Sequence, residues 1–402
     1  MLQSDLARAE AHLDEFLRRT GVRGGAGDPS RRYLWNDAHA VQTLLSVARR
    51  RGTREPIEDA ARLAELVHRT LGRHRKDDPR SGWISGLGEL AGEQHPTKGG
   101  LRIGKPLRER AIGEPFDEFL EWERDGQYFH YLTRWMEALC ALGGATGERG
   151  WCRMSIELAT RACAAFTYFP SAGAPPRMYW KMSIDLARPL VKSMGLLDPL
   201  DGFTTVARVR ATERALDGEP VLARELEQLH AMLVEPAMWA TTDPLGIGGL
   251  LHAATEQCAL VESGDLAFEP LLHELLAAIH RSLEFFASNA RFSQPLERRL
   301  AFRELGLALG VQGIDAMLLS IKRTPERFGS VADLESLAAR LDSMSKFSLL
   351  ARHIEETWDS DGARATQGWL EHIDINQVML AASLAGLQGA ASPAERLPAT
   401  GR

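Results

Sequence analysis

The chain has 402 residues, with 48 Lys and Arg against 54 Asp and Glu, and a formal net charge of −6. No basic arm or tail is present, which excludes the electrostatic pattern of a typical nucleic-acid-binding protein. The N-terminus lacks the pattern of a secretory signal, and no apolar run approaches the roughly 18 residues that a membrane span needs. We therefore expect a cytoplasmic protein without a nucleic-acid or membrane partner; its oligomeric state stays open.

The four cysteines are scattered along the chain and form no CxxC pair. Three of them lie in apolar, helical sequence, so the pattern favours buried, reduced thiols in a cytosolic protein over a disulfide framework. No spacing of the HxxxH or HExxH type supports a metal site. We expect neither a metal nor a cofactor.

The first third of the chain begins with helical periodicity. Residues 2–20 predict an amphipathic helix, which the segment 21–29 ends. A helix over 33–50 follows, and then an outer helix over 56–71. This last helix has a proline at its start, a glycine just past its end, and a single apolar stripe.

Residues 73–126 interrupt the helical pattern with a long segment rich in glycine and charge. Structureless stretches of this length inside a compact domain are usually functional or disordered. Disorder fits poorly, because the segment carries many large apolar side chains that need burial. We predict an ordered flap over one face of the domain, with these side chains buried: Trp83, Ile84, Leu87, Leu101, Ile103, Phe116, Phe119 and Trp122.

Helical periodicity then resumes and continues almost to the C-terminus, with almost no alternation of the kind that strands show. We expect one domain over residues 1–388 and a flexible tail over 389–402. The predicted helices cover residues 127–144, 149–167, 178–194, 203–215, 219–235, 246–262, 267–288, 296–310, 312–323, 331–341, 346–358 and 373–386.

Six of these helices share a feature at their N-terminal ends. Each begins with a polar or aromatic cluster and continues into sequence rich in small and apolar residues. Helices that are apolar on nearly all sides are buried on both faces. We therefore predict six inner helices, each paired with an outer helix, in a closed ring around a central pocket; the six clusters begin at Tyr33, Gln127, Met178, Gly246, Arg298 and His372.

This alternation of hairpins resembles the six-hairpin, or (α/α)6 toroid, superfamily. The resemblance covers nearly the whole chain and implies an all-α fold. Many glycoside hydrolases, polysaccharide lyases and sugar 2-epimerases have this fold, although the paired histidine signatures of the acylglucosamine 2-epimerases are absent. The stretches that start at Gly82, Asp125 and Tyr179 resemble signatures of a bacterial branch of the superfamily.

Four aspartates lie at or near the starts of predicted inner helices: Asp37, Asp125, Asp185 and Asp374. A glycosidase needs two carboxyl groups, one protonated and one ionised. Burial beside an indole raises a carboxyl pKa and keeps the group protonated. These four are our candidates for catalysis, with Glu121 as a substrate-binding neighbour; the alternative role for each is a helix cap.

Four histidines also lie near the starts of different inner helices: His39, His130, His252 and His372. A histidine can take a proton from a carbon next to a carbonyl group, as an epimerase requires. We name His130 as a catalytic candidate and the other three as substrate-binding residues. The alternative for each histidine is a hydrogen-bonded, non-catalytic position in the wall of the pocket.

Aromatic and basic side chains beside these clusters suit a sugar or an anionic ligand. Sugar rings stack on indole and phenol rings, which otherwise fill a core, and a buried lysine needs an anionic partner. The flap lysines and arginines, with Gly99, Gly100 and Gly104, suit an anion clamp, and Asp77 with Asp78 suits magnesium. The further substrate-binding candidates are Trp35, Trp83, Arg102, Tyr128, Tyr179, Lys181, Arg303 and Asn376.

The mixture of carboxylate, amide, imidazole and indole groups favours an enzyme that acts on a carbohydrate. Glycoside hydrolysis is the leading prediction, followed by sugar epimerisation or isomerisation through a histidine. A magnesium-dependent cyclase or transferase of prenyl diphosphates is a further alternative. A ligand-binding scaffold without catalysis is the last.

Overall fold

The computed structural model describes residues 2–24, 27–28, 31–233, 236–288 and 294–386. The tail predicted for residues 389–402 lies outside these ranges. The described residues form two compact units. The N-terminal unit comprises those of 17–233, and the C-terminal unit comprises those of 2–16 and 236–386.

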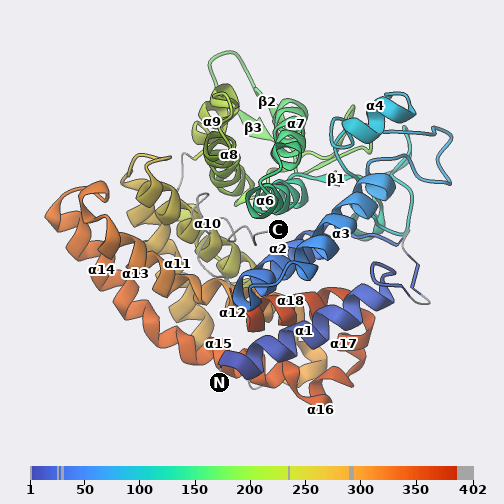
Figure 1. Cartoon of the computed structure of the whole chain (residues 1–402). Helices are drawn as coiled ribbons and strands as arrows, with labels where there is room; N and C mark the ends of the chain where they lie inside the picture. Colours follow the sequence, from blue (N-terminus) through green and yellow to red (C-terminus); the bar gives the residue numbers. More distant parts are fainter. Residues whose placement is uncertain (1, 25–26, 29–30, 234–235, 289–293, 387–402) are drawn as a thin grey trace, which may run out of the picture. The chain divides into compact units, whose positions relative to one another are not determined.

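Three helical hairpins form the body of the N-terminal unit (Figure 1). Each hairpin has an inner helix followed by an outer one, and the inner helices α2, α6 and α8 pack side by side in that order. Contacts between their first turns, described below, show that they point the same way. The hairpins are α2 (Leu34–Arg51) with α3 (Glu55–Leu71), α6 (Phe129–Thr146) with α7 (Arg149–Phe166), and α8 (Asp198–Ala215) with α9 (Ala223–His230).

Short strands occupy the segment for which the sequence predicts a helix over 178–194. That prediction is wrong, because Pro189 lacks the N–H that a helix interior needs and Leu186 has a positive φ of 59°. The third inner helix is instead α8. The strands form two antiparallel sheets, β1 (Gln127–Tyr128) with β4 (Lys181–Met182) and β5 (Pro189–Val191), and β2 (Thr167–Tyr168) with β3 (Arg177–Met178).

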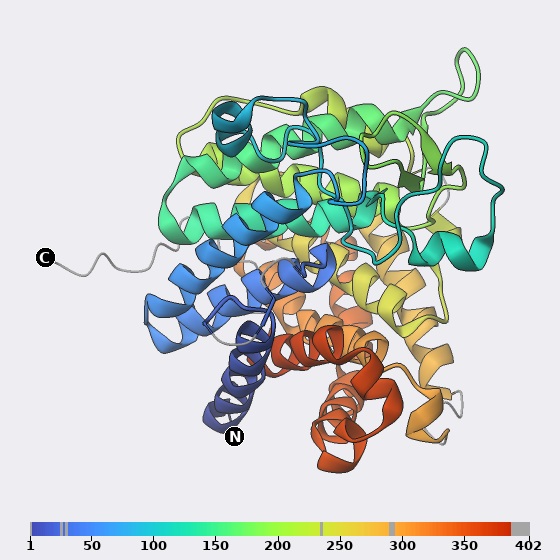
Figure 2. The same cartoon turned by 90° about the vertical axis from the view of Figure 1, so that its right-hand side faces the viewer.

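The segment 73–126 forms long connections with only two short helices, α4 (Glu89–Gln94) and α5 (Glu118–Glu123), as Figure 2 shows in blue to teal. It is ordered, as predicted. The buried amide of Gln127 fixes it, since Oε1 accepts from the Leu101 backbone at 2.8 Å and Nε2 donates to the Gly99 and Ile184 carbonyls. Gly104 has a φ of +93°, and a Cβ there would lie 2.1 Å from the Arg32 carbonyl oxygen.

Part of the burial predicted for this flap is wrong. Trp83, Ile84, Leu101 and Ile103 are buried, but three large apolar side chains of its second half are exposed. Phe116 packs against the Arg110 guanidinium and Trp122 packs against Trp180, but these contacts leave much of each ring exposed. The exposed fractions are 57% for Phe116, 86% for Phe119 and 42% for Trp122.

The C-terminal unit also packs inner helices side by side. The helices α10 and α12 lie against each other, and α12 lies against α18. A Cβ on Gly248 would lie 2.2 Å from the Gly306 carbonyl oxygen, so the glycines of this stretch permit close helix packing. The helices are α1 (Leu2–Arg19, from residue 17 in the N-terminal unit), α10 (Pro244–Ser263), α11 (Leu271–Ser288), α12 (Ala301–Val311), α13 (Gly313–Arg323), α14 (Val331–Met344), α15 (Ser348–Asp359), α16 (Asp361–Arg364), α17 (Gln367–Glu371) and α18 (Ile373–Ala385), with 3-10 turns at Pro236–Trp239, Leu296–Arg298, Pro325–Arg327 and Ser345–Phe347.

The predicted all-α class is confirmed, and each unit holds inner helices paired with outer helices. The four cysteines are free and buried, as expected. Among the described residues one segment, Ala301–Arg323, is long and apolar enough to cross a membrane, with a mean hydropathy of 1.4 over its window. In the structure 72% of that window is buried.

Candidate functional site

The first turns of α2 and α6 bring together an aromatic cluster, which comprises Tyr33, Trp35, Tyr128, His130 and Tyr131. The Tyr33 and Tyr131 hydroxyls form a hydrogen bond of 2.7 Å. Tyr128 stacks on His130 with ring centroids 5.3 Å apart, and Tyr131 meets the same imidazole edge-on at 4.9 Å. Trp35 lies 5.2 Å from the Tyr131 ring and 6.2 Å from the His130 ring.

The first turn of α8 adds a carboxyl group to this cluster. His130 Nδ1 lies 3.6 Å from Asp198 Oδ1, and the two side chains are 27% and 8% exposed. Neither His130 Nδ1 nor the second oxygen of Asp198 has a hydrogen-bond partner in the described part of the chain. Buried polar atoms in native proteins are nearly always hydrogen-bonded. The pair therefore has unused hydrogen-bonding capacity that suits a ligand.

The electrostatics of this pair favour neutral groups. Burial raises the pKa of Asp198 to about 8, and the nearby charge of Asp201 acts in the same direction. Burial lowers the pKa of His130 to about 3, and the Arg134 cation adds to that effect. Near neutral pH a neutral imidazole thus faces a largely protonated carboxyl group, and the pair is not a salt bridge.

A polar row continues from this pair along the facing sides of α6 and α8. Arg134 is hydrogen-bonded to Asp201 and, at 2.8 Å, to Glu137, and Thr133 also donates to Asp201. Thr205 donates to the other oxygen of Glu137 at 3.0 Å. Arg134 thus neutralises the charge of Asp201. The carboxyl group that faces the imidazole is that of Asp198.

Lys181 is fully buried and anchors the end of the flap. Its Nζ donates to Glu121 Oε1 at 3.0 Å and to the backbone carbonyls of Glu121 and Arg124 at 2.6 and 2.8 Å. Burial lowers its pKa, which the Glu121 carboxylate partly opposes. Arg110 binds the second oxygen of Glu121 at 2.9 Å. The anionic partner expected for Lys181 is thus Glu121, within the chain.

Asp125 is also fully buried, at the start of β1. Its carboxylate accepts from Arg102 at 2.9 Å, from Arg75 at 3.4 Å, and from the Gly104 and Gly126 backbone at 2.9 and 3.0 Å. Both oxygens are engaged. These contacts connect the flap to the strand. The guanidinium of Arg102, a predicted substrate-binding residue, is bound to Asp125.

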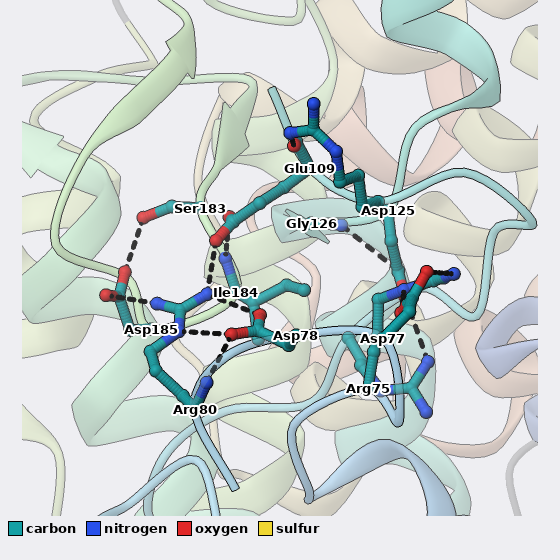
Figure 3. A network of polar contacts seen from close by, with 12 residues as sticks. Arg75, Asp77, Asp78, Arg80, Glu109, Asp125, Gly126, Ser183, Ile184 and Asp185 are labelled. Atoms are coloured by element: carbon teal, nitrogen blue, oxygen red, sulfur yellow. Dashed lines mark hydrogen bonds and ion pairs between the residues drawn. The ribbon is translucent and has the colours of Figure 1, made fainter. Parts of the chain in front are cut away.

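Asp185 lies in a loop between β4 and β5, in the network of polar contacts that Figure 3 shows. The Arg80 guanidinium forms three ion pairs, with Asp185 at 2.7 Å, with Asp78 at 2.8 Å and with Glu109 at 2.5 Å. Asp77 is paired with Arg75 at 2.7 Å. Both carboxylates considered for magnesium are thus held by arginines, and among the described residues no group of three or more His, Cys, Asp or Glu side chains is placed to hold a metal ion.

The other candidates of the N-terminal unit are spread around the cluster. His39 lies beside Trp35, with ring centroids 4.9 Å apart. Asp37 is buried and accepts from the Tyr33 backbone at 3.2 Å. Two aromatics lie elsewhere: Trp83 packs in the flap under Arg73, and Tyr179 stacks on Tyr168 at 4.4 Å.

The remaining candidates lie in the C-terminal unit, near the starts of α10, α12 and α18. Arg303 pairs with Asp243 at 2.7 Å. Asn376 accepts from the Phe302 backbone at 3.0 Å, and Phe302 lies 5.9 Å from the His372 ring. His252 and Asp374 are half-buried on α10 and in the first turn of α18.

A buried ion pair lies in the same unit. Arg299 binds both oxygens of Glu304, at 2.8 and 2.6 Å. The Trp358 indole donates to the same carboxylate at 2.8 Å.

The sequence analysis did not select Asp198, Asp201, Arg134 or Glu137. Asp198 precedes a proline at the start of α8, which is a recognisable helix-start pattern. Arg134 and Glu137 follow His130 at helical spacing on one side of α6. These signals were present, but the third inner helix was expected earlier in the chain.

No protein-family description matches this sequence, and no curated protein matches it. Among solved structures, the chain is similar to cellobiose 2-epimerase from Spirochaeta thermophila DSM 6192. The TM-score is 0.45 at 12% identity, and the match covers 85% of this chain and 98% of the epimerase.

Proposed function

We propose that this protein is a sugar epimerase or isomerase that transfers a proton at the carbon next to a carbonyl group. The observation that carries the proposal is the His130–Asp198 pair inside the aromatic cluster. A carboxyl group and a neutral imidazole of lowered pKa are the pair that enediolate chemistry requires, one as base and the other as hydrogen-bond donor.

Asp198 is the proposed base. Its pKa of about 8 lies close to a physiological working pH, where proton transfer by a general acid or base is most effective. The ionised carboxylate takes the proton from the carbon, and the C–H electrons move to form the enediolate. The protonated Asp198 carboxyl then returns the proton. If the enediolate first turns its other face toward Asp198, return to the same carbon gives the epimer, and return to the neighbouring carbon gives the isomer.

His130 is the proposed donor to the carbonyl oxygen. A neutral imidazole donates a hydrogen bond to the developing oxyanion without carrying a competing charge. Its lowered pKa keeps it neutral over the whole physiological range. Trp35, which is half-buried, supplies a ring face for the apolar side of a sugar.

Glycoside hydrolysis is a second candidate, favoured by one observation. The protonated carboxyl group of Asp198 is what the acid of a glycosidase must be. Hydrolysis also needs a second, ionised carboxylate that is free to act on the substrate. The nearby Asp201 is bound by Arg134 and Thr133.

The two candidates are separated by incubating the protein in D2O with a panel of aldoses, ketoses and disaccharides, followed by NMR. The proposal expects a new epimer or isomer with deuterium at the carbon next to the carbonyl. Cleavage of a disaccharide without that label supports hydrolysis instead. No change in any sugar of the panel contradicts both.

A further inference from the structure

Two lysines lie near the aromatic cluster, and their surroundings differ. Lys181 is fully buried and makes three hydrogen bonds. Lys105 is half-buried, and in the described part of the chain its Nζ makes neither a hydrogen bond nor an ion pair. Its ammonium group lies over the Tyr33 ring, 5.6 Å from the centroid.

The place of Lys105 links it to the proposed reaction. Tyr33 is hydrogen-bonded to Tyr131, and Tyr131 packs against the His130 imidazole. Two contacting tyrosine rings therefore connect the ammonium group with the His130 imidazole. A substrate whose reacting carbon lies at His130 would reach Lys105 along these rings.

The charges around Lys105 leave its own charge incompletely balanced. Burial lowers its pKa, and Glu123 and Asp125 act in the opposite direction. Asp125 is already bound by Arg102 and Arg75, and the Glu123 side chain is exposed. A desolvated cation in such surroundings is stabilised by an anion that comes within contact distance.

We propose that Lys105 binds a negatively charged group of the substrate, so that the site takes an acidic sugar with a carboxylate or phosphate at the end remote from the carbonyl. This proposal rests on the proposed function. Charge-assisted hydrogen bonds to carboxylate or phosphate oxygens are among the stronger polar contacts. Lys105 is then a specificity-determining residue, distinct from the structural Lys181.

The test is calorimetric titration of the full chain with glucuronate, glucose 6-phosphate and glucose. Wild type is expected to bind one of the two anions about tenfold or more tightly than glucose, which corresponds to one charge-assisted contact. Lys105→Gln is expected to lose that preference while its glucose affinity and thermal midpoint stay unchanged. The control Lys98→Gln removes an exposed charge from the same flap and is expected to behave as wild type.

Comparison of the two anions shows whether the group is a carboxylate or a phosphate. An unchanged preference in Lys105→Gln, a preference of wild type for glucose, or no binding of either anion overturns the proposal. Deuterium exchange distinguishes failure of this proposal from failure of the proposed function. If glucose exchanges deuterium and Lys105 has no effect on anion binding, the proposed function holds and the anion site does not. If anion binding depends on Lys105 but no sugar exchanges deuterium, the anion site holds and the proposed function does not.

Discussion

His130 Nδ1 lies 3.6 Å from Asp198 Oδ1, so the first turns of α6 and α8 place an imidazole against a carboxyl group. The aromatic rings around them remove water, which moves the two pKa values in opposite directions. A pair of titratable groups whose pKa values are pushed apart is the usual sign of an acid–base assignment. Two predictions test this pair and two test the flap, and none of the four needs the substrate.

Asp198→Asn is expected to change how stability depends on pH. In wild type the carboxyl keeps its proton up to about pH 8 in the folded chain but loses it near 3.8 in the unfolded chain. The unfolded state therefore binds fewer protons between these values, and wild type loses stability as pH rises through that window. The variant lacks this loss, so its stability relative to wild type should increase from about pH 4 to about pH 8.

Urea unfolding of both proteins at several pH values measures this difference. His130, whose pKa is lowered, contributes a gain in stability as pH rises from about 3 to 6.5, and it is present in both proteins. A difference between the proteins that stays constant over the window would show that Asp198 ionises normally.

Trp35→Ala is expected to raise the pKa of His130 from about 3 toward the ordinary value of 6.5. The indole lies 6.2 Å from the imidazole, and its removal admits water that stabilises the charged form. An NMR titration of the imidazole resonances measures the shift. The control Trp151→Ala, whose indole lies against His68, should leave the titration of His130 unchanged.

Lys181→Met is expected to destabilise the flap. The change leaves Glu121 without its lysine partner and two backbone carbonyls without a donor. Breaking a buried ion pair by removing one partner costs about 3–5 kcal/mol. Urea unfolding measures the loss, and limited proteolysis should show earlier cleavage between residues 107 and 124. A variant with wild-type stability would mean that Lys181 is not held as described.

Asp125→Asn is expected to destabilise the fold far more than Asp77→Asn does. Both carboxylates bind Arg75, but Asp125 is fully buried and also accepts from Arg102 and two backbone amides. Loss of a buried, hydrogen-bonded charge costs about 3–5 kcal/mol, whereas exposed pairs contribute little. Thermal unfolding of the two variants compares them directly, and equal midpoints would argue against this structural role.

The sequence predicted the helical class and much of the aromatic cluster. Trp35, Tyr128 and His130 were selected because each stands at the start of a helix that is apolar on nearly all sides, and such starts meet when the helices are parallel. This reasoning needs only local periodicity. It therefore succeeded where α2 and α6 follow the pattern.

Asp198 was not predicted, because the sequence of Met178–Asp185 has the same pattern as the start of an inner helix. Within this stretch Met178, Lys181 and Met182 lie in short strands instead of a helix. Lys181 is neutralised by Glu121, 60 residues away in the sequence. Local patterns contain no information on such distant partners. The exposure of Phe119 was missed for a related reason, since composition shows which side chains favour burial but not whether the chain path reaches the core.

The most direct test of the account is the rate of deuterium incorporation next to the carbonyl group, measured by NMR in D2O. The protein, Asp198→Asn, His130→Gln and the control His95→Gln, which lies outside the cluster and is bound to Glu157, would be compared on the sugar that exchanges fastest. General acid–base groups contribute about 10²–10⁴-fold, so both site variants should fall by that factor while the control stays at the wild-type rate. Exchange at the wild-type rate in correctly folded Asp198→Asn and His130→Gln would contradict the account.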